Sequence, residues 1–270
     1  VLFSPTDDPK KLRALANIVP PELESTFPRD HRLGTASIYL HSEISAFFSA
    51  TRPVEGLWMA VTTPPCPNCA KMIVEAGIAR LFIDTQGLSG AFARERAGDI
   101  KDMSMEIFRR AGVSVHLVNR KTSHIKPAVD ADTLDIPPVP ANTHRFHVPE
   151  GGIATLIPEL QRRFEGEAFA LARVRLDRGL EQAYLTLASL PPGFTPERYL
   201  RSEQDKEGKY RFPVDPMNRL LIHCKRFGLQ LMDGHVICSM HPSSRALVNA
   251  VAARVHTITT LRDEPDHGEM

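Results

Sequence analysis

The apolar positions of the first 120 residues alternate between helical and strand spacing. In residues 42–50, Ile44, Phe47 and Phe48 share one face of a helical projection. Residues 57–61 form a short apolar run that Thr-Thr-Pro-Pro then interrupts, which is typical of a buried strand followed by a helix start. The expected elements are a helix at 42–50, a strand at 57–61, a helix from 66 to about 79, and a helix and strand within 107–118. This alternation predicts an α/β fold.

A second run of such elements follows a proline-rich and acidic stretch. Residues 126–145 lack periodicity, so we expect a linker between a domain at 1–125 and a domain at 146–270. The second domain begins with an amphipathic stretch at 153–168 and strands at 169–176 and 183–188. The opening residues 1–3 fit only the end of a strand equivalent to 183–188. We therefore expect the first domain to lack an N-terminal helix and strand.

Candidate chemistry is concentrated in two short segments of the first domain. His41, Cys66 and Cys69 supply one imidazole and two thiolates, and this set leaves a fourth tetrahedral position of a zinc ion open for water. Both cysteines fall at a predicted helix start, where unpaired N–H groups stabilise thiolates. Glu43 lies two residues from His41, so its carboxylate can take a proton from that water. We predict Zn²⁺ bound by His41, Cys66 and Cys69, with Glu43 as the catalytic acid and base.

Two other interpretations fit these residues less well. A C-x-x-C sequence alone also occurs in redox proteins, but here a histidine and a glutamate accompany it. A structural zinc site normally has four protein ligands, and no fourth ligand lies near this pattern.

The combination H-x-E with P-C-x-x-C is the pattern of zinc-dependent nucleobase deaminases. Residues 61–78 further resemble the cytidine and deoxycytidylate deaminase superfamily, most closely its deoxycytidylate branch, through Cys-Ala-Lys at 69–71 and Ala-Gly-Ile at 76–78. Residues 107–118 are similar to a later helix and strand of that family. The resemblance covers roughly residues 36–120. It implies a cytidine deaminase-like three-layer α/β/α fold with a central mixed sheet, and hydrolytic release of ammonia from an aminopyrimidine.

The substrate expected from this resemblance is a cytosine nucleotide or nucleoside, with dCMP as the best candidate. Ser42 and Ser45 depart from the alanine and asparagine usual in the deoxycytidylate branch. The alternatives are a transfer-RNA editing deaminase with an inactive partner domain, and a deaminase of guanine or of a pterin or riboflavin precursor. A binding protein without activity is the least favoured alternative, because binding alone does not require Glu43.

The sequence of the second domain resembles that of the first and is interpreted as a degenerate copy of it. An ungapped alignment sets residues 236–255 under 62–81 and matches Lys71 with Arg245. In that alignment the four functional positions His41, Glu43, Cys66 and Cys69 become Asp215, Met217, Met240 and Ser243. We therefore expect a tandem duplication whose second copy is pseudo-catalytic. A separate zinc site at His235, Cys238 and His241 is a rival interpretation, and Cys224 and Cys238 are more simply buried thiols.

The composition limits the kinds of partner that this protein is expected to bind. The net charge is +1 and no long basic block occurs, so extended nucleic-acid binding is not favoured. No apolar run is long enough to cross a membrane, and we expect a cytoplasmic protein without a membrane partner. Its expected partners are a small-molecule substrate and either a second copy of the chain or its own second domain, as an internal pseudo-dimer.

Overall fold

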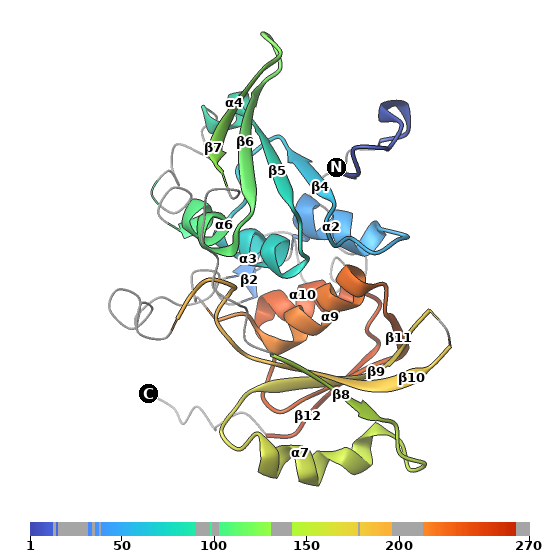
Figure 1. Cartoon of the computed structure of the whole chain (residues 1–270). Coiled ribbons are helices and arrows are strands. Elements are labelled where there is room, and N and C mark those ends of the chain that lie inside the picture. Colours follow the sequence, from blue (N-terminus) through green and yellow to red (C-terminus); the bar gives the residue numbers. More distant parts are fainter. Residues whose placement is uncertain are drawn as a thin grey trace.

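The computed structural model contains two five-stranded mixed sheets with helices packed between them (Figure 1). It describes residues 1–12, 15, 32–33, 36–37, 39–89, 98, 103–130, 142–177, 179–195 and 213–262. The predicted α/β class is confirmed. Among the described helices, none has the length and apolar character needed to span a bilayer.

The first sheet has the strand order β1-β4-β5-β6-β7. Strands β4, β5 and β6 are parallel, and β1 and β7 are antiparallel edge strands. Its strands are β1 (Leu2–Phe3), β4 (Trp58–Val61), β5 (Arg80–Asp84), β6 (Ser114–Asn119) and β7 (His124–Val129). The described helices of this half are η1 (Pro9–Lys11), α2 (Ser42–Ser49), α3 (Pro67–Glu75), α4 (Thr85–Leu88) and α6 (Met105–Ala111). A separate two-stranded ribbon joins β2 (Arg32–Leu33) to β3 (Ala36–Ser37).

The second sheet has the order β12-β11-β9-β10-β8, in which only β11 and β12 are parallel. Its strands are β8 (Thr143–His147), β9 (Phe169–Arg175), β10 (Glu181–Leu187), β11 (Gln230–Cys238) and β12 (Thr257–Thr260). The helices are η4 (Ile153–Leu156), α7 (Ile157–Arg163), α9 (Pro216–Phe227) and α10 (Ser244–Ala252). These bounds agree with the elements predicted at 153–168, 169–176 and 183–188.

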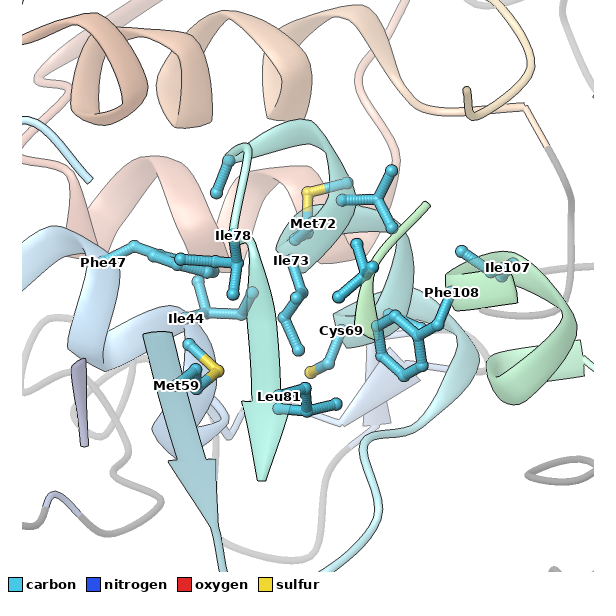
Figure 2. Close-up of a cluster of buried hydrophobic side chains, with 14 of the residues drawn as sticks. Ile44, Phe47, Met59, Cys69, Met72, Ile73, Ile78, Leu81, Ile107 and Phe108 are labelled. Carbon is cyan, nitrogen blue, oxygen red and sulfur yellow. The ribbon is translucent and has the colours of Figure 1, made fainter. Parts of the chain in front are cut away.

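The two halves face each other through their helices. Helices α2 and α3 of the first half and α9 and α10 of the second lie between the sheets, and α7 covers the far face of the second sheet (Figure 1). The main apolar cluster lies between the first sheet and its helices, where Phe47, Ile73 and Leu81 are fully buried (Figure 2). The predicted three-layer arrangement is therefore complete around the second sheet, with α7 on one side and α9 and α10 on the other.

The two halves repeat the same local structure. Strand β4 pairs parallel with β5 as β11 does with β12, and it pairs antiparallel with β1 as β11 does with β9. The helix ends also correspond. Gly77 after α3 and Arg254 after α10 both have positive φ, and the flanking backbone hydrogen bonds are equivalent. This correspondence supports the predicted tandem duplication.

The structure corrects the predicted alignment in its second part. Trp58 of β4 pairs with Arg80 of β5, and in the second half His235 of β11 pairs with Thr257 of β12. Trp58 therefore corresponds to His235, and residues from β4 to β5 correspond to second-half residues three positions later than the predicted alignment placed them. Cys66 therefore corresponds to Ser243, the residue that caps α10, and Cys69 corresponds to Ala246. The earlier match of His41 with Asp215 holds, because both residues cap their helices. A shift of three residues nearly preserves helical periodicity, and this is why the wrong register also matched apolar positions.

The first strand and the linker also differ from expectation. Strand β1 pairs with β4, just as β9 pairs with β11 in the second half. Strand β1 is therefore the counterpart of β9 and not of β10, the strand predicted at 183–188. Both ends of the predicted linker 126–145 belong to strands, β7 and β8, while residues 131–141 lie outside the described part. Pro127 argued against a strand in the sequence, but β7 is an edge strand, where proline is tolerated.

In the second half, the carboxylate of Asp215 joins the starts of two helices. The Asp215 carboxylate accepts hydrogen bonds from the backbone N–H groups of Met217 and Asn218 at the start of α9. Its other oxygen accepts one from the N–H of Ser243, 2.9 Å away, at the start of α10. We expect Asp215→Ala to lower the free energy of unfolding by about 2 kcal/mol, because two part-buried N–H donors at the start of α9 and the N–H of Ser243 lose their acceptor.

Chemical denaturation of the full chain measures this loss. Asp215→Asn is the matched variant, since its single amide oxygen can keep the α9 cap while the bond to Ser243 is lost. The loss should therefore be intermediate, and zinc content should be unchanged in both variants. An unfolding free energy of Asp215→Ala equal to that of the unmodified chain would contradict this role.

Candidate active site

Helix α2 places His41 and Glu43 at one end of the first sheet. His41 is the residue that caps α2, and Glu43 lies in the first turn. The helix forms as the apolar spacing predicted, with Ile44 and Phe47 buried against the core. Because this face is fixed by packing, the helix start and the two polar side chains on it are fixed as well.

Helix α3 places the two cysteines. Cys66 caps the helix and Cys69 lies in its first turn, as predicted. Pro67 occupies the first helical position, where its missing N–H is not needed and its ring sets the backbone angle. The helix ends at Glu75 rather than near residue 79, because Gly77 takes a positive φ of 70° and reverses the chain. Cys66 and Cys69 are both buried.

The starts of α2 and α3 converge, so the structure brings His41, Cys66 and Cys69 together. Nδ1 of His41 lies 3.6 Å from the Cys66 sulfur and 3.2 Å from the Cys69 sulfur. The three ligand atoms all lie within 4.8 Å of one another. These separations fit a tetrahedral centre with Zn–S near about 2.3 Å and Zn–N near about 2.1 Å. The donor set could therefore hold a zinc ion, and its three members leave one position for a further ligand.

The two thiols differ in acidity. The pKa of Cys66 is lowered well below its usual value, first by a hydrogen bond from the Cys69 thiol, while burial opposes this and His41 contributes further. The backbone N–H of Cys69 also donates to the Cys66 sulfur. The pKa of Cys69 is raised, first by the same hydrogen bond and then by burial. Cys66 is thus the first thiolate to form, at a helix start that favours negative charge.

Glu43 is a buried carboxyl group beside this cluster. Its side chain is 9% exposed, and the Ser42 hydroxyl donates to Oε2 over 3.3 Å. Burial raises its pKa above the usual value, and the charge of Cys66 raises it further. A carboxyl group with a raised pKa exchanges a proton more readily near neutral pH than an exposed one. The chemical requirement for a proton carrier is therefore met at this position.

The structure does not assemble the rival zinc site in the second half. His235 Nε2 contacts the Thr259 hydroxyl at 2.9 Å, and His241 Nδ1 lies 3.0 Å from the Pro242 carbonyl. Within the described residues, the only cluster of three potential metal ligands is His41, Cys66 and Cys69. Cys224 and Cys238 are buried free thiols, and burial raises the pKa of each to about 12. The interpretation of these two as apolar-like thiols is confirmed.

Sequence reasoning missed the polar residues that join the halves. Arg219 of α9 donates from Nε and Nη2 to both carboxylate oxygens of Glu75 at the end of α3, over 3.0 and 2.7 Å. His223 Nε2 lies 3.1 Å from the same carboxylate, and its Nδ1 lies 3.1 Å from the Tyr184 hydroxyl. All four side chains are buried. The signal available in the sequence was a pair of ionisable residues, Arg219 and His223, spaced four positions apart among apolar residues.

Comparison with known proteins shows which class of protein this site resembles. Residues 17–85 match the model of the cytidine and deoxycytidylate deaminase zinc-binding region. This match supports the resemblance to the cytidine and deoxycytidylate deaminase superfamily that the sequence pattern predicted. The α/β fold with mixed sheets agrees with that resemblance.

Individual relatives match over the same region. An uncharacterized deaminase encoded in the luxG 3′ region of Aliivibrio fischeri is 38% identical over 76 residues, which is 28% of this chain and 50% of the relative. The deoxycytidylate deaminase of Enterobacteria phage T4 is 34% identical over 86 residues, 30% of this chain and 39% of the relative. The similarity thus spans half or less of these relatives. No solved structure matches the chain.

Proposed function

We propose that this protein is a zinc-dependent hydrolytic deaminase of a cytosine nucleotide or nucleoside, with dCMP as the best candidate substrate. The observation that carries the proposal is the convergence of one imidazole and two thiols within 4.8 Å beside a buried carboxyl group. This set fits zinc and leaves a position for water. The family match and the similarity to a phage deoxycytidylate deaminase support the reaction class and the substrate.

In this proposal each residue of the site has one role. His41, Cys66 and Cys69 would hold the metal, and a zinc ion bound there would supply a nucleophile at neutral pH by lowering the pKa of water. Glu43 accepts a proton from the attacking water and returns it to the ring nitrogen next to the amino-bearing carbon. The water oxygen bonds to that carbon, and the amino group leaves with a second proton as ammonia. The Glu43 carboxyl group is buried, so bulk water does not compete for its proton.

We further infer that residues 1–125 form the catalytic domain and residues 146–270 a pseudo-catalytic copy, which together make an internal pseudo-dimer. The corrected alignment supports this, since the positions of Glu43, Cys66 and Cys69 carry Met217, Ser243 and Ala246. None of these three side chains can replace a thiolate ligand or a catalytic carboxylate. The buried contacts of Arg219 and His223 with Glu75 join the two copies.

Ammonia release by the zinc-loaded full chain tests the proposed function. The substrates to compare are cytosine, cytidine, deoxycytidine, their mono- and triphosphates, guanine, adenosine and a transfer RNA. We expect turnover confined to cytosine compounds, with dCMP the best. Turnover of guanine or of transfer RNA alone would contradict the substrate class, and one bound zinc without any ammonia release would contradict the activity.

A further inference from the structure

Arg245 of the second half lies next to the metal-ligand cluster of the first half. It belongs to the first turn of α10, and its Nη1 donates to the backbone carbonyl of Tyr39 over 2.6 Å. Tyr39 lies two residues before His41, and α10 contacts both α2 and β3. A side chain from the pseudo-catalytic copy is therefore held at the chain segment that leads into the candidate active site.

The charge of Arg245 reaches that site. Its guanidinium group is held at the Tyr39 carbonyl, two residues before His41, and α10 packs against α2, the helix that His41 caps. Electrostatic interactions of this kind weaken with distance and with exposure to water. The guanidinium group therefore lies within electrostatic range of the ligand cluster.

Among the described residues, the guanidinium group of Arg245 has more N–H donors than acceptors. In the part of the chain that the structure describes, Nη1 is the only nitrogen of this group with a hydrogen-bond acceptor, the Tyr39 carbonyl. The Arg245 side chain is half-buried, so it is positioned by its surroundings without being enclosed. Arginine binds phosphate and carboxylate groups through paired N–H donors, and a guanidinium group with one side free can do so.

The candidate active site needs a cation if its substrate is an anion. Two thiolates and the Glu43 carboxylate together carry more negative charge than a zinc dication compensates. A nucleotide phosphate would be repelled by that excess in the partly buried surroundings of the site. Arg245 supplies positive charge at this position, and it comes from outside the family's zinc-binding motif.

We propose that Arg245 binds the phosphate of a nucleotide substrate, so that the second half supplies a specificity-determining residue to the active site of the first. This inference rests on the proposed function, because the substrate base must lie at the His41, Cys66 and Cys69 cluster. It assigns the pseudo-catalytic copy a direct contact with substrate and favours a nucleoside monophosphate over the corresponding nucleoside.

Comparing dCMP with deoxycytidine tests the proposal in the zinc-loaded full chain. In Arg245→Gln, we expect kcat/KM for dCMP to fall about 10- to 100-fold while kcat/KM for deoxycytidine stays unchanged, since only dCMP carries the phosphate. Arg245→Lys keeps the charge without the paired donors. Its kcat/KM for dCMP should therefore lie between that of the unmodified chain and that of Arg245→Gln. Arg173→Gln is the control, because Arg173 lies on β9 of the second sheet in ion pairs with Glu181 and Asp233.

Calorimetric binding of dCMP, deoxycytidine and inorganic phosphate gives a readout that is independent of turnover. Equal losses for dCMP and deoxycytidine in Arg245→Gln would overturn the proposal, because Arg245 would then act only through the fold. Unchanged kinetics for both would overturn it too. If the unmodified chain releases no ammonia from either compound, the proposed function fails. Phosphate or dCMP binding that is weaker in Arg245→Gln then still supports the anion site, and equal binding overturns it.

Discussion

Replacing Glu43 with glutamine is expected to abolish most turnover while leaving the metal in place. Glutamine has nearly the same size and keeps the hydrogen bond from Ser42, but it cannot accept and return a proton. General acid–base catalysis contributes about 10²- to 10⁴-fold to rate, so kcat should fall by that factor. Ammonia release measures kcat, and elemental analysis measures zinc per chain.

Two matched variants separate the roles at this site. Cys69→Ser should lose both zinc and turnover, because a hydroxyl is a much weaker zinc ligand than a thiolate. Glu159→Gln, on α7 beyond the second sheet, should change neither. Turnover of Glu43→Gln equal to that of the unmodified chain would remove Glu43 from the mechanism. Loss of zinc in that variant would instead make Glu43 a support of the metal site.

The second large effect concerns the buried ion pair between the halves. Arg219 is 1% exposed and donates to both oxygens of Glu75 and to the backbone carbonyl of Leu187. Arg219→Met leaves the Glu75 carboxylate buried without its cation, and breaking such a pair costs about 3–5 kcal/mol. We expect the free energy of unfolding to fall by that amount in chemical denaturation. Since Glu75 ends the helix that begins at Cys66, zinc affinity should fall as well.

The double variant Glu75→Leu with Arg219→Met is the control for this prediction. Replacing both members of a buried pair with apolar residues removes the unpaired charge, so much of the lost stability should return. Recovery should be incomplete, because the carbonyls of Leu187 and Ser189 lose the guanidinium donors. A single-variant loss below about 1 kcal/mol would show that this pair does not hold the halves together.

The same cluster predicts how stability depends on pH. Burial would raise the pKa of Glu75, but Arg219 and His223 outweigh burial and lower it to about 2. Burial lowers the pKa of His223, against the opposing effect of Glu75. Both groups bind fewer protons in the folded state than in the unfolded state. Their contributions are therefore complete above pH 6.5 and diminish as the pH falls, with the Glu75 part lost between about pH 4.5 and 2.

Unfolding free energies from pH 7 down to pH 3 test this dependence. We expect Glu75→Gln to have a smaller loss of stability with acid than the unmodified chain, because glutamine does not titrate. His223→Gln should remove the part that falls below pH 6.5. Parallel curves for the unmodified chain and Glu75→Gln would contradict the lowered pKa of Glu75.

Local signals predicted the elements around the site well. The helix at 42–50 and the strand at 57–61 became α2 and β4 within one or two residues, since apolar spacing and proline act within a few residues of the chain. The segments that were misjudged depend on distant partners. Residues 126–129 read as linker because nothing local shows that β7 pairs with β6.

Residues 1–3 were misjudged for the same reason. Three residues carry too little pattern to distinguish one strand of a sheet from its neighbour, and only pairing with β4 identifies the position of β1. The alignment error of three residues near Cys66 has a related cause. Apolar residues recur every three to four positions in any buried helix, so only strand pairing and helix caps define the correct register.

The sequence by itself determined the α/β class, the motif of His41, Glu43, Cys66 and Cys69, and the resemblance of that motif to the cytidine and deoxycytidylate deaminase superfamily. These three features depend on residue types at short spacing, because residues close together at a helix start also lie close together in space. Only the tertiary structure decided that Arg219 pairs with Glu75 and that Arg245 reaches the Tyr39 carbonyl. Each of these contacts joins residues more than 140 positions apart, and such contacts arise from how the two halves pack rather than from any local pattern.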